Sequence, residues 1–313
     1  MPKPTLAVET LSICSGCEIA ILDLHQALPG VLEAIDLKYI QVLMDHREPP
    51  EGVTVGFVSG AVRNEEHVEL LHKMRERCSI LVAFGACAAF GGIPGLANLS
   101  TREELLKEVY IDAKSNVNPK GVIPHKVVPP LLPEVHPISD FVKVDYILPG
   151  CPPPPKLIGE LVTCLLEGKE FRLEPITVCD QCPLEKDEKS VTNFFRWATH
   201  KIDPTRCLLE QGFQCMGPVT QGGCEARCPT ALAPCRGCFG PTEKVTDQAA
   251  KMIGAIGSIV IQDVKNAPSP DQIVKEIPDI VGTYLRFSLA SSTFKKALHT
   301  GGAKTKQRKA VKA

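Results

Sequence analysis

Short apolar runs alternate with amphipathic stretches through the first half of the chain. After the first strand and the loop Ser12–Cys17, a helical pattern extends to about Leu28, where Pro29 follows, and further helical patterns cover Glu65–Arg77 and Lys156–Glu167. Between them, runs of six to eight residues predict buried strands at 4–9, 37–44, 53–58, 79–85 and 141–148. Apolar strands that alternate with helices are typical of a parallel sheet covered on both faces. We therefore expect an α/β domain over residues 1–170 with a flavodoxin-like, doubly wound parallel sheet.

The pattern changes after residue 170. Residues 171–240 are rich in Gly and Pro and show little periodicity apart from a helical stretch at 190–200. We expect this segment to have little regular structure and no apolar core. Helical patterns return at 244–261 and 271–289, which extends the second, smaller domain to 171–290. In the first half, the proline-rich segment 95–140 predicts an irregular excursion over the surface.

Composition makes the cysteines the feature that needs an explanation. The chain has 313 residues, of which 44% are hydrophobic and 23% charged, so it can bury a core without disulfides. Nevertheless 14 residues are cysteine. The net charge of −1 gives no indication of nucleic-acid binding. Residues 291–313 contain seven Lys and Arg and no Asp or Glu, which predicts a mobile basic tail.

The sequence also bears on the compartment. The N-terminus shows neither an apolar signal core nor a twin-arginine pair, and the uncharged stretch 78–101 contains glycines and a proline that disfavour a membrane span. We expect a cytoplasmic protein. In a reducing compartment, cysteines serve more often as metal ligands or catalytic groups than in disulfides.

Four cysteines follow predicted strands of the first domain. Cys14 and Cys17 lie in the loop after the first strand, Cys87 follows the fourth strand, and Cys151 follows the fifth. The carboxyl ends of parallel strands meet at one edge of a sheet, where ligands bind in doubly wound folds. The four thiols are therefore expected to form one metal site.

Eight further cysteines occupy 60 residues of the second domain: Cys179, Cys182, Cys207, Cys215, Cys224, Cys228, Cys235 and Cys238. Eight thiols make two sets of four, the number that an iron–sulfur cubane takes. Zinc and disulfides remain alternatives, although the two C-x2-C units are 52 residues apart, whereas zinc ribbons place them about 15–20 apart. Cys78 and Cys164 are expected to be core residues.

Four motifs in order resemble the small subunit of nickel–iron hydrogenases, from about residue 5 to 240. They are Cys14-Ser-Gly-Cys17-Glu18, Gly60-Ala61-Val62-Arg63-Asn64-Glu65-Glu66-His67, Gly85-Ala86-Cys87-Ala88-Ala89-Phe90-Gly91-Gly92 and Pro149-Gly150-Cys151-Pro152-Pro153. The resemblance implies a flavodoxin-like domain with a proximal 4Fe–4S cluster, then a cysteine-rich domain with medial and distal clusters. The nickel–iron site lies in a separate large subunit, so this chain contributes no catalytic residue. A complex-I-type relative would lack the second cysteine group.

The resemblance also assigns the ligands. The proximal set is Cys14, Cys17, Cys87 and Cys151; the medial set is Cys224, Cys228, Cys235 and Cys238; the distal set is Cys179, Cys182, Cys207 and Cys215. Cys179 stands where exported members of the family have a histidine. Together with the absent export signal and the full medial set, this favours the cytoplasmic methanogen branch, whose enzymes reduce methyl viologen and not the deazaflavin coenzyme.

The function implied is electron transfer. Electrons from hydrogen oxidation in the large subunit would pass through three 4Fe–4S clusters to an iron–sulfur partner, a delta-type subunit, that feeds heterodisulfide reductase. A small subunit of a deazaflavin-reducing hydrogenase and, in another class, a zinc-stapled interaction protein are the alternatives. Glu18 is either a proton relay or a carboxylate stabilised at a helix N-terminus.

Overall fold

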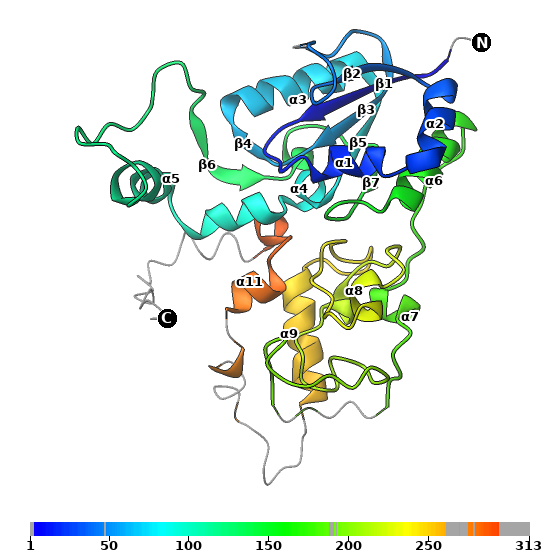
Figure 1. The fold of residues 1–313 in the computed structure, drawn as a ribbon, viewed down its shortest axis with the longest axis vertical. Coiled ribbons are helices and arrows are strands. Elements are labelled where there is room, and N and C mark those ends of the chain that lie inside the picture. The colour runs from blue at the N-terminus through cyan, green and yellow to red at the C-terminus, as the bar shows by residue number, and fades with distance from the viewer. Residues whose placement is uncertain are drawn as a thin grey trace.

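The computed structural model describes residues 3–46, 48–187, 191, 193–260, 269, 275–277 and 279–293. Figure 1 shows a sheet with its helices in the upper part and an irregular region with short helices in the lower part. The predicted basic tail lies outside the described residues from residue 294 onward, as does most of the first half of the predicted helix 271–289.

The sheet has five parallel strands. They are β1 (Thr5–Thr10), β2 (Asp36–Ile40), β3 (Val53–Ser59), β5 (Cys78–Phe84) and β7 (Tyr146–Leu148). Their order is β2-β1-β3-β5-β7, with parallel pairing throughout. This is the flavodoxin-like order, which confirms the predicted fold class. The last strand, predicted at 141–148, was too long, because residues 141–145 form turns and irregular structure before β7 begins at Tyr146.

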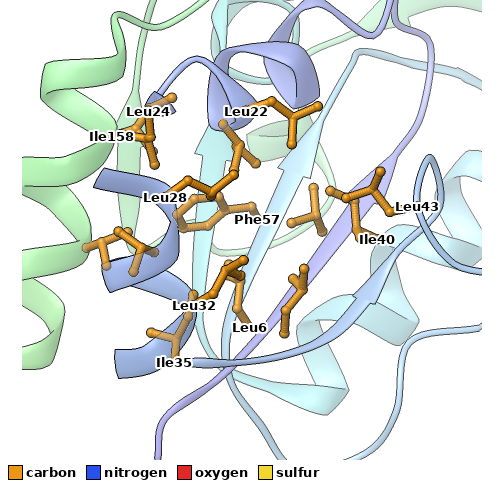
Figure 2. A pocket seen from close by; sticks show the side chains of 15 residues that line it. Leu6, Leu22, Leu24, Leu28, Leu32, Ile35, Ile40, Leu43, Phe57 and Ile158 are labelled. Atoms are coloured by element: carbon orange, nitrogen blue, oxygen red, sulfur yellow. The ribbon is translucent and has the colours of Figure 1, made fainter. Parts of the chain in front are cut away.

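Helices cover both faces of the sheet. On one face, α1 (Gly16–Leu22), α2 (Leu28–Ala34) and α6 (Pro155–Leu166) pack over Leu6 and Phe57. On the other, α3 (Glu65–Arg77) and α4 (Ala86–Phe90) pack over a second apolar cluster. Figure 2 shows the small apolar pocket that remains between α1, α2 and the sheet.

The prediction of one helix up to Leu28 was wrong. α1 ends at Leu22, a 3-10 turn follows at His25–Ala27, and α2 then begins at Leu28. Pro29 lies in the first turn of α2 instead of ending a helix. A proline there loses no hydrogen bond, because the first N–H groups of a helix have no partner in the helix.

The segment 95–140 is more regular than predicted. It contains the 3-10 helix η2 (Ile93–Leu99), α5 (Arg102–Lys107), a π turn (Glu108–Asp112) and β6 (Leu131–His136). β6 pairs antiparallel with β4 (Val62–Asn64). Thr101 and Glu104 form a capping box at the start of α5. Only the stretch between the π turn and β6 remains irregular.

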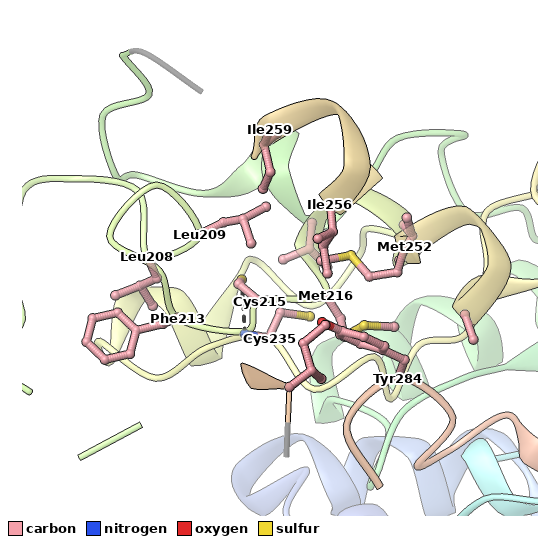
Figure 3. Close-up of a cluster of buried hydrophobic side chains, with 14 of the residues drawn as sticks. Leu208, Leu209, Phe213, Cys215, Met216, Cys235, Met252, Ile256, Ile259 and Tyr284 are labelled. Carbon is pink, nitrogen blue, oxygen red and sulfur yellow. Dashed lines mark hydrogen bonds between the residues drawn. The ribbon is translucent and has the colours of Figure 1, made fainter. Parts of the chain in front are cut away.

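The lower part of the molecule has an apolar core, contrary to the sequence prediction. Leu208, Phe213 and Met216 from the cysteine-rich segment pack with Met252 and Ile256 of α9 (Gln248–Ile259), as Figure 3 shows. The prediction failed because nearly half of the buried residues of this core come from after residue 240. Where 191–200 is described, it forms isolated bridges and turns in place of the predicted helix.

Short elements complete this lower part: α7 (Val178–Gln181), the 3-10 helix Gly217–Val219, α8 (Arg227–Thr230), α11 (Ile280–Tyr284) and the 3-10 helix Leu289–Ser291. Asp247 caps α9 by accepting from the amide of Ala250, and it also accepts from Ser292 and Thr293. The end of the described chain is thereby fastened to α9. No helix in the part that the structure describes is both long and apolar enough to cross a membrane.

Candidate metal centres

The structure brings together the four cysteines that follow strands. Cys14 lies in the loop between β1 and α1, and Cys17 lies in the first turn of α1. Cys87 lies in α4 after β5, and Cys151 follows β7. Burial raises the pKa of Cys17 most, and the Glu18 carboxylate is the next cause. The thiols of the other three cysteines raise it further. Burial, and next the thiol of Cys151, raise the pKa of Cys87 to about 12. These mutual effects place the four thiols within electrostatic reach of one another.

Two glycines keep this group of thiols open. Gly85 has φ +89°, and a Cβ atom there would lie 2.4 Å from Sγ of Cys17. At Gly92, a Cβ atom would lie 2.5 Å from Sγ of Cys87. Any side chain at either position would displace a thiol, so the backbone itself forms the wall of the site.

A second group of thiols lines one pocket. Cys179, Cys182, Cys207 and Cys215 all contribute to its wall, together with Lys186. Burial, followed by the thiol of Cys215, raises the pKa of Cys179 to about 12, while Lys186 acts in the opposite direction. The Cys215 thiol is buried and accepts a hydrogen bond from the amide of Gly217. The structure therefore assembles the set that the resemblance assigned as distal.

The third group lies between the other two. Burial is the main cause that raises the pKa of Cys238 to about 12, and the thiols of Cys224, Cys228 and Cys151 add to it. The Cys151 amide donates a hydrogen bond to the Cys238 thiol. Cys235 lies toward the Cys179 group, because its amide donates to Sγ of Cys215 over 3.3 Å, the contact dashed in Figure 3. Each outer group thus meets the middle one through an N–H···S hydrogen bond.

The donor chemistry of these groups fits a thiolate-bound cofactor. Each group offers four sulfur atoms, the donor set that iron–sulfur clusters take. Burial raises the pKa of Cys235 well above its ordinary value, so that thiolate needs a cationic partner to form. Among the described residues, no three His, Cys, Asp or Glu side chains are placed to hold a single metal ion.

Glu18 is buried, with 1% of its surface exposed. Ser59 Oγ donates a hydrogen bond to its Oε1, whereas its Oε2 has no hydrogen-bond partner among the described residues. A buried carboxylate oxygen without a partner is uncommon in proteins. Its position in the third residue of α1 is compatible with both roles predicted for it.

Of the other two cysteines, Cys78 is a core residue as predicted, whereas Cys164 is only partly buried. Cys78 is buried at the start of β5, and Cys164 on α6 packs against the cluster under that helix. Sequence reasoning missed Arg236, which lies between Cys235 and Cys238 and close to thiols of two groups. The positive charge inside a C-x2-C unit was the available signal.

Comparison with known proteins identifies the family. The family described as "NADH ubiquinone oxidoreductase, 20 Kd subunit" matches residues 14–165, which end before the second group of cysteines. Similarity to a whole relative extends much further. A subunit of the "F420-non-reducing hydrogenase vhu" of Methanocaldococcus jannaschii is 45% identical over 290 residues, covering 91% of this chain and 96% of the relative. The chain belongs to the hydrogenase small-subunit family.

Two other similarities support membership of this hydrogenase family. The "F420-non-reducing hydrogenase iron-sulfur subunit" of Archaeoglobus profundus is 35% identical over 314 residues, covering 91% of this chain and 96% of the relative. A solved structure, "Crystal structure of NAD+-reducing [NiFe]-hydrogenase in the H2-reduced state", superposes with a TM-score of 0.53 at 35% identity. It covers 55% of this chain and 96% of the solved chain. The resemblance found from the sequence motifs is thereby confirmed.

Proposed function

We propose that this hydrogenase subunit carries electrons from hydrogen oxidation, which takes place in a large subunit, through three 4Fe–4S clusters in series. The observation that carries the proposal is the order of the three thiol groups. Cys151 and Cys238 connect the first group to the middle one, and Cys235 and Cys215 connect the middle group to the third. We accordingly propose residues 1–170 and 171–290 as the two domains of the electron path.

The proposed ligands follow the same grouping. They are Cys14, Cys17, Cys87 and Cys151 for the proximal site; Cys224, Cys228, Cys235 and Cys238 for the medial site; and Cys179, Cys182, Cys207 and Cys215 for the distal site. When bound there, the clusters would supply one-electron carriers.

The chain itself would tune these sites through backbone donors. The amide of Ile93 donates to the thiol of Cys87, and the amide of Gly237 donates to that of Cys235. Amides that point at sulfur stabilise added negative charge, and such hydrogen bonds are among the levers that set cluster potentials. The hydrogen bond from Ser59 leaves one oxygen of Glu18 free to exchange a proton at the proximal edge, which supports a relay role.

We propose that the large subunit covers the proximal edge. Cys14 and Cys151 are exposed there. Beside them, Ile19 on α1 is 55% exposed and Ile93 at the start of η2 is 44% exposed. Exposed thiols flanked by exposed aliphatic side chains are typical of a surface that a partner buries.

We expect Ile19→Asp to weaken association with the large subunit. Burying an isoleucine side chain contributes roughly 1.5–3 kcal/mol, and each 1.4 kcal/mol is about tenfold in Kd. The Kd should therefore rise at least about tenfold. Co-purification of the nickel-containing large subunit with tagged variants would measure this.

The matched control is Ile253→Asp on α9, where the isoleucine is 48% exposed but lies in the other part of the molecule. This variant should retain the large subunit. Equal retention by both variants would place the large subunit on another surface.

The electron acceptor is proposed from the family branch. The branch that the sequence motifs imply suggests an iron–sulfur delta-type partner that feeds heterodisulfide reductase, reached from the Cys179 group, and the relatives' names, "F420-non-reducing", disfavour the deazaflavin coenzyme as acceptor. A cytoplasmic site of action is proposed on the same basis. A deazaflavin-reducing assignment would require the purified complex to reduce that coenzyme with hydrogen.

Metal analysis of the anaerobically purified chain tests the proposal. Three 4Fe–4S clusters predict about twelve iron and about twelve acid-labile sulfide per chain, with a brown colour. Stoichiometric zinc without visible absorption would contradict it and favour a zinc-stapled interaction protein.

A further inference from the structure

The loop from Cys235 to Cys238 joins two groups of thiols and is held rigidly. The Cys235 amide donates to Cys215 of the neighbouring group, and the Gly237 carbonyl accepts from Nε2 of Gln248 at 3.2 Å. Gly237 has φ +84°, and a Cβ atom there would lie 3.0 Å from the same Nε2 atom. The residue between them, Arg236, is thus carried by a backbone with little freedom to move.

Arg236 lies among thiols and another cation, without an acidic partner. Its half-buried guanidinium interacts with the thiols of Cys228, Cys215 and Cys235, and with the guanidinium of Arg286. Arg286 is also half-buried, and its Nε donates to the carbonyl of Gly282 over 2.8 Å. Within the described part of the chain, neither arginine forms an ion pair with a carboxylate.

Two guanidiniums that interact electrostatically and are partly removed from water repel each other, and each loses hydration. Such a pair is costly unless negative charge lies nearby. Among the groups that interact electrostatically with Arg236, the sulfur atoms of Cys228, Cys235 and Cys215 can supply it. The pair is therefore placed where the proposed function would concentrate negative charge.

We propose that Arg236, supported by Arg286, raises the reduction potentials of the middle iron–sulfur site and of the site formed by the Cys179 group. Electron movement away from the proximal site is thereby favoured. The inference rests on the proposed function. Each step moves one electron from a reduced site to an oxidised one, with hydrogen as the reductant, and no bond or proton changes. A fixed positive charge stabilises the reduced form, because that form carries one more negative charge.

The effect should be larger at the middle site. Arg236 interacts with two thiols of that site, Cys228 and Cys235, and with one thiol of the Cys179 group, Cys215. After burial, the groups that act most strongly on the pKa of Arg236 are Arg286 and these three thiols, none of which belongs to the proximal set. Removing the charge should therefore leave the proximal potential unchanged.

The test is a redox titration, monitored by electron paramagnetic resonance, of the complex with its large subunit. In Arg236→Gln, reduction of the middle site should become about tenfold less favourable, which lowers its midpoint by about 59 mV for a one-electron couple. Arg236→Lys keeps the charge and should stay within about twofold of wild type. The matched control is Arg227→Gln: Arg227 is exposed beside Cys228, so its charge is screened.

Iron content separates tuning from structural support. An unchanged or raised middle midpoint in Arg236→Gln with full iron would overturn the proposal. If Arg236→Gln loses iron, Arg286→Gln decides: a lowered midpoint supports the proposal and an unchanged one overturns it. A wild-type chain without iron would overturn the proposed function instead.

Discussion

Gly85→Ala is expected to remove the proximal site while leaving the rest of the protein folded. The new Cβ would lie 2.4 Å from Sγ of Cys17, well inside van der Waals contact, and 3.5 Å from the carbonyl oxygen of Gly150. The residue also adopts φ +89°, which strains a side chain by roughly 1–2 kcal/mol. The backbone cannot shift easily, because the amide of Gly85 donates a hydrogen bond to the carbonyl of Leu148 and the amide of Ala86 donates one to the carbonyl of Gly150.

The thiol of Cys17 must therefore move away from its three partners. We expect a loss of about four of twelve iron atoms. Reduction of viologen by hydrogen should fall at least about a hundredfold, or roughly 2.7 kcal/mol of activation free energy. Iron analysis and a viologen assay of the purified complex would measure both.

Gly254→Ala is the matched control. Gly254 lies in α9 with nothing within 4 Å of an added Cβ atom. Alanine there should keep all the iron and raise stability by about 0.5–1 kcal/mol, because glycine is unfavourable inside a helix. A Gly85→Ala protein with the iron content and rate of this control would show that Cys17 does not hold a proximal cluster.

The sheet and the proximal thiols could be predicted because local patterns determine them. Apolar strands such as 53–58 are recognisable from a few residues, and parallel pairing then places the residues after each strand at one edge. Cys87 and Cys151 are 64 positions apart in the sequence, yet each directly follows a strand. Their convergence follows from topology alone.

The lower part of the molecule could not be predicted in the same way. Its core joins Phe213 from the cysteine-rich segment with Met252 from α9 and Tyr284 from α11, so no single window of sequence contains it. Tertiary contacts also decide the path near Phe195, which pairs with Phe213 instead of extending a helix. This core means that the segment does not depend on bound metal alone for its folding.

The contacts between the thiol groups were likewise beyond the sequence, although the family resemblance implied the order proximal, medial, distal. Spacing groups Cys235 with Cys238, and nothing in the spacing says that one meets Cys215 and the other Cys151. Those contacts depend on loop conformations that the surrounding packing selects. Because these contacts connect the three groups in series, they support the serial electron path of the proposed function.

Cys238→Ala is expected to interrupt that path at its middle. Cys238 is the proposed medial ligand whose thiol accepts from the amide of Cys151, so its loss removes both a ligand and the contact with the proximal group. The large subunit should still catalyse isotope exchange between deuterium gas and water, because that reaction does not need electrons to leave through this chain. Electron delivery to an acceptor at the Cys179 group should fall at least about a hundredfold, or roughly 2.7 kcal/mol of activation free energy.

Cys164→Ala is the control, because Cys164 packs on α6 outside the three groups and its replacement should keep the iron content and rate of wild type.

The most direct measurement is the electron paramagnetic resonance spectrum of the Cys238→Ala complex frozen after brief exposure to hydrogen. Electrons are expected to reach the site of Cys14, Cys17, Cys87 and Cys151, while the site of Cys179, Cys182, Cys207 and Cys215 stays oxidised. Reduction of both sites at the rate of the Cys164→Ala control would contradict a serial path.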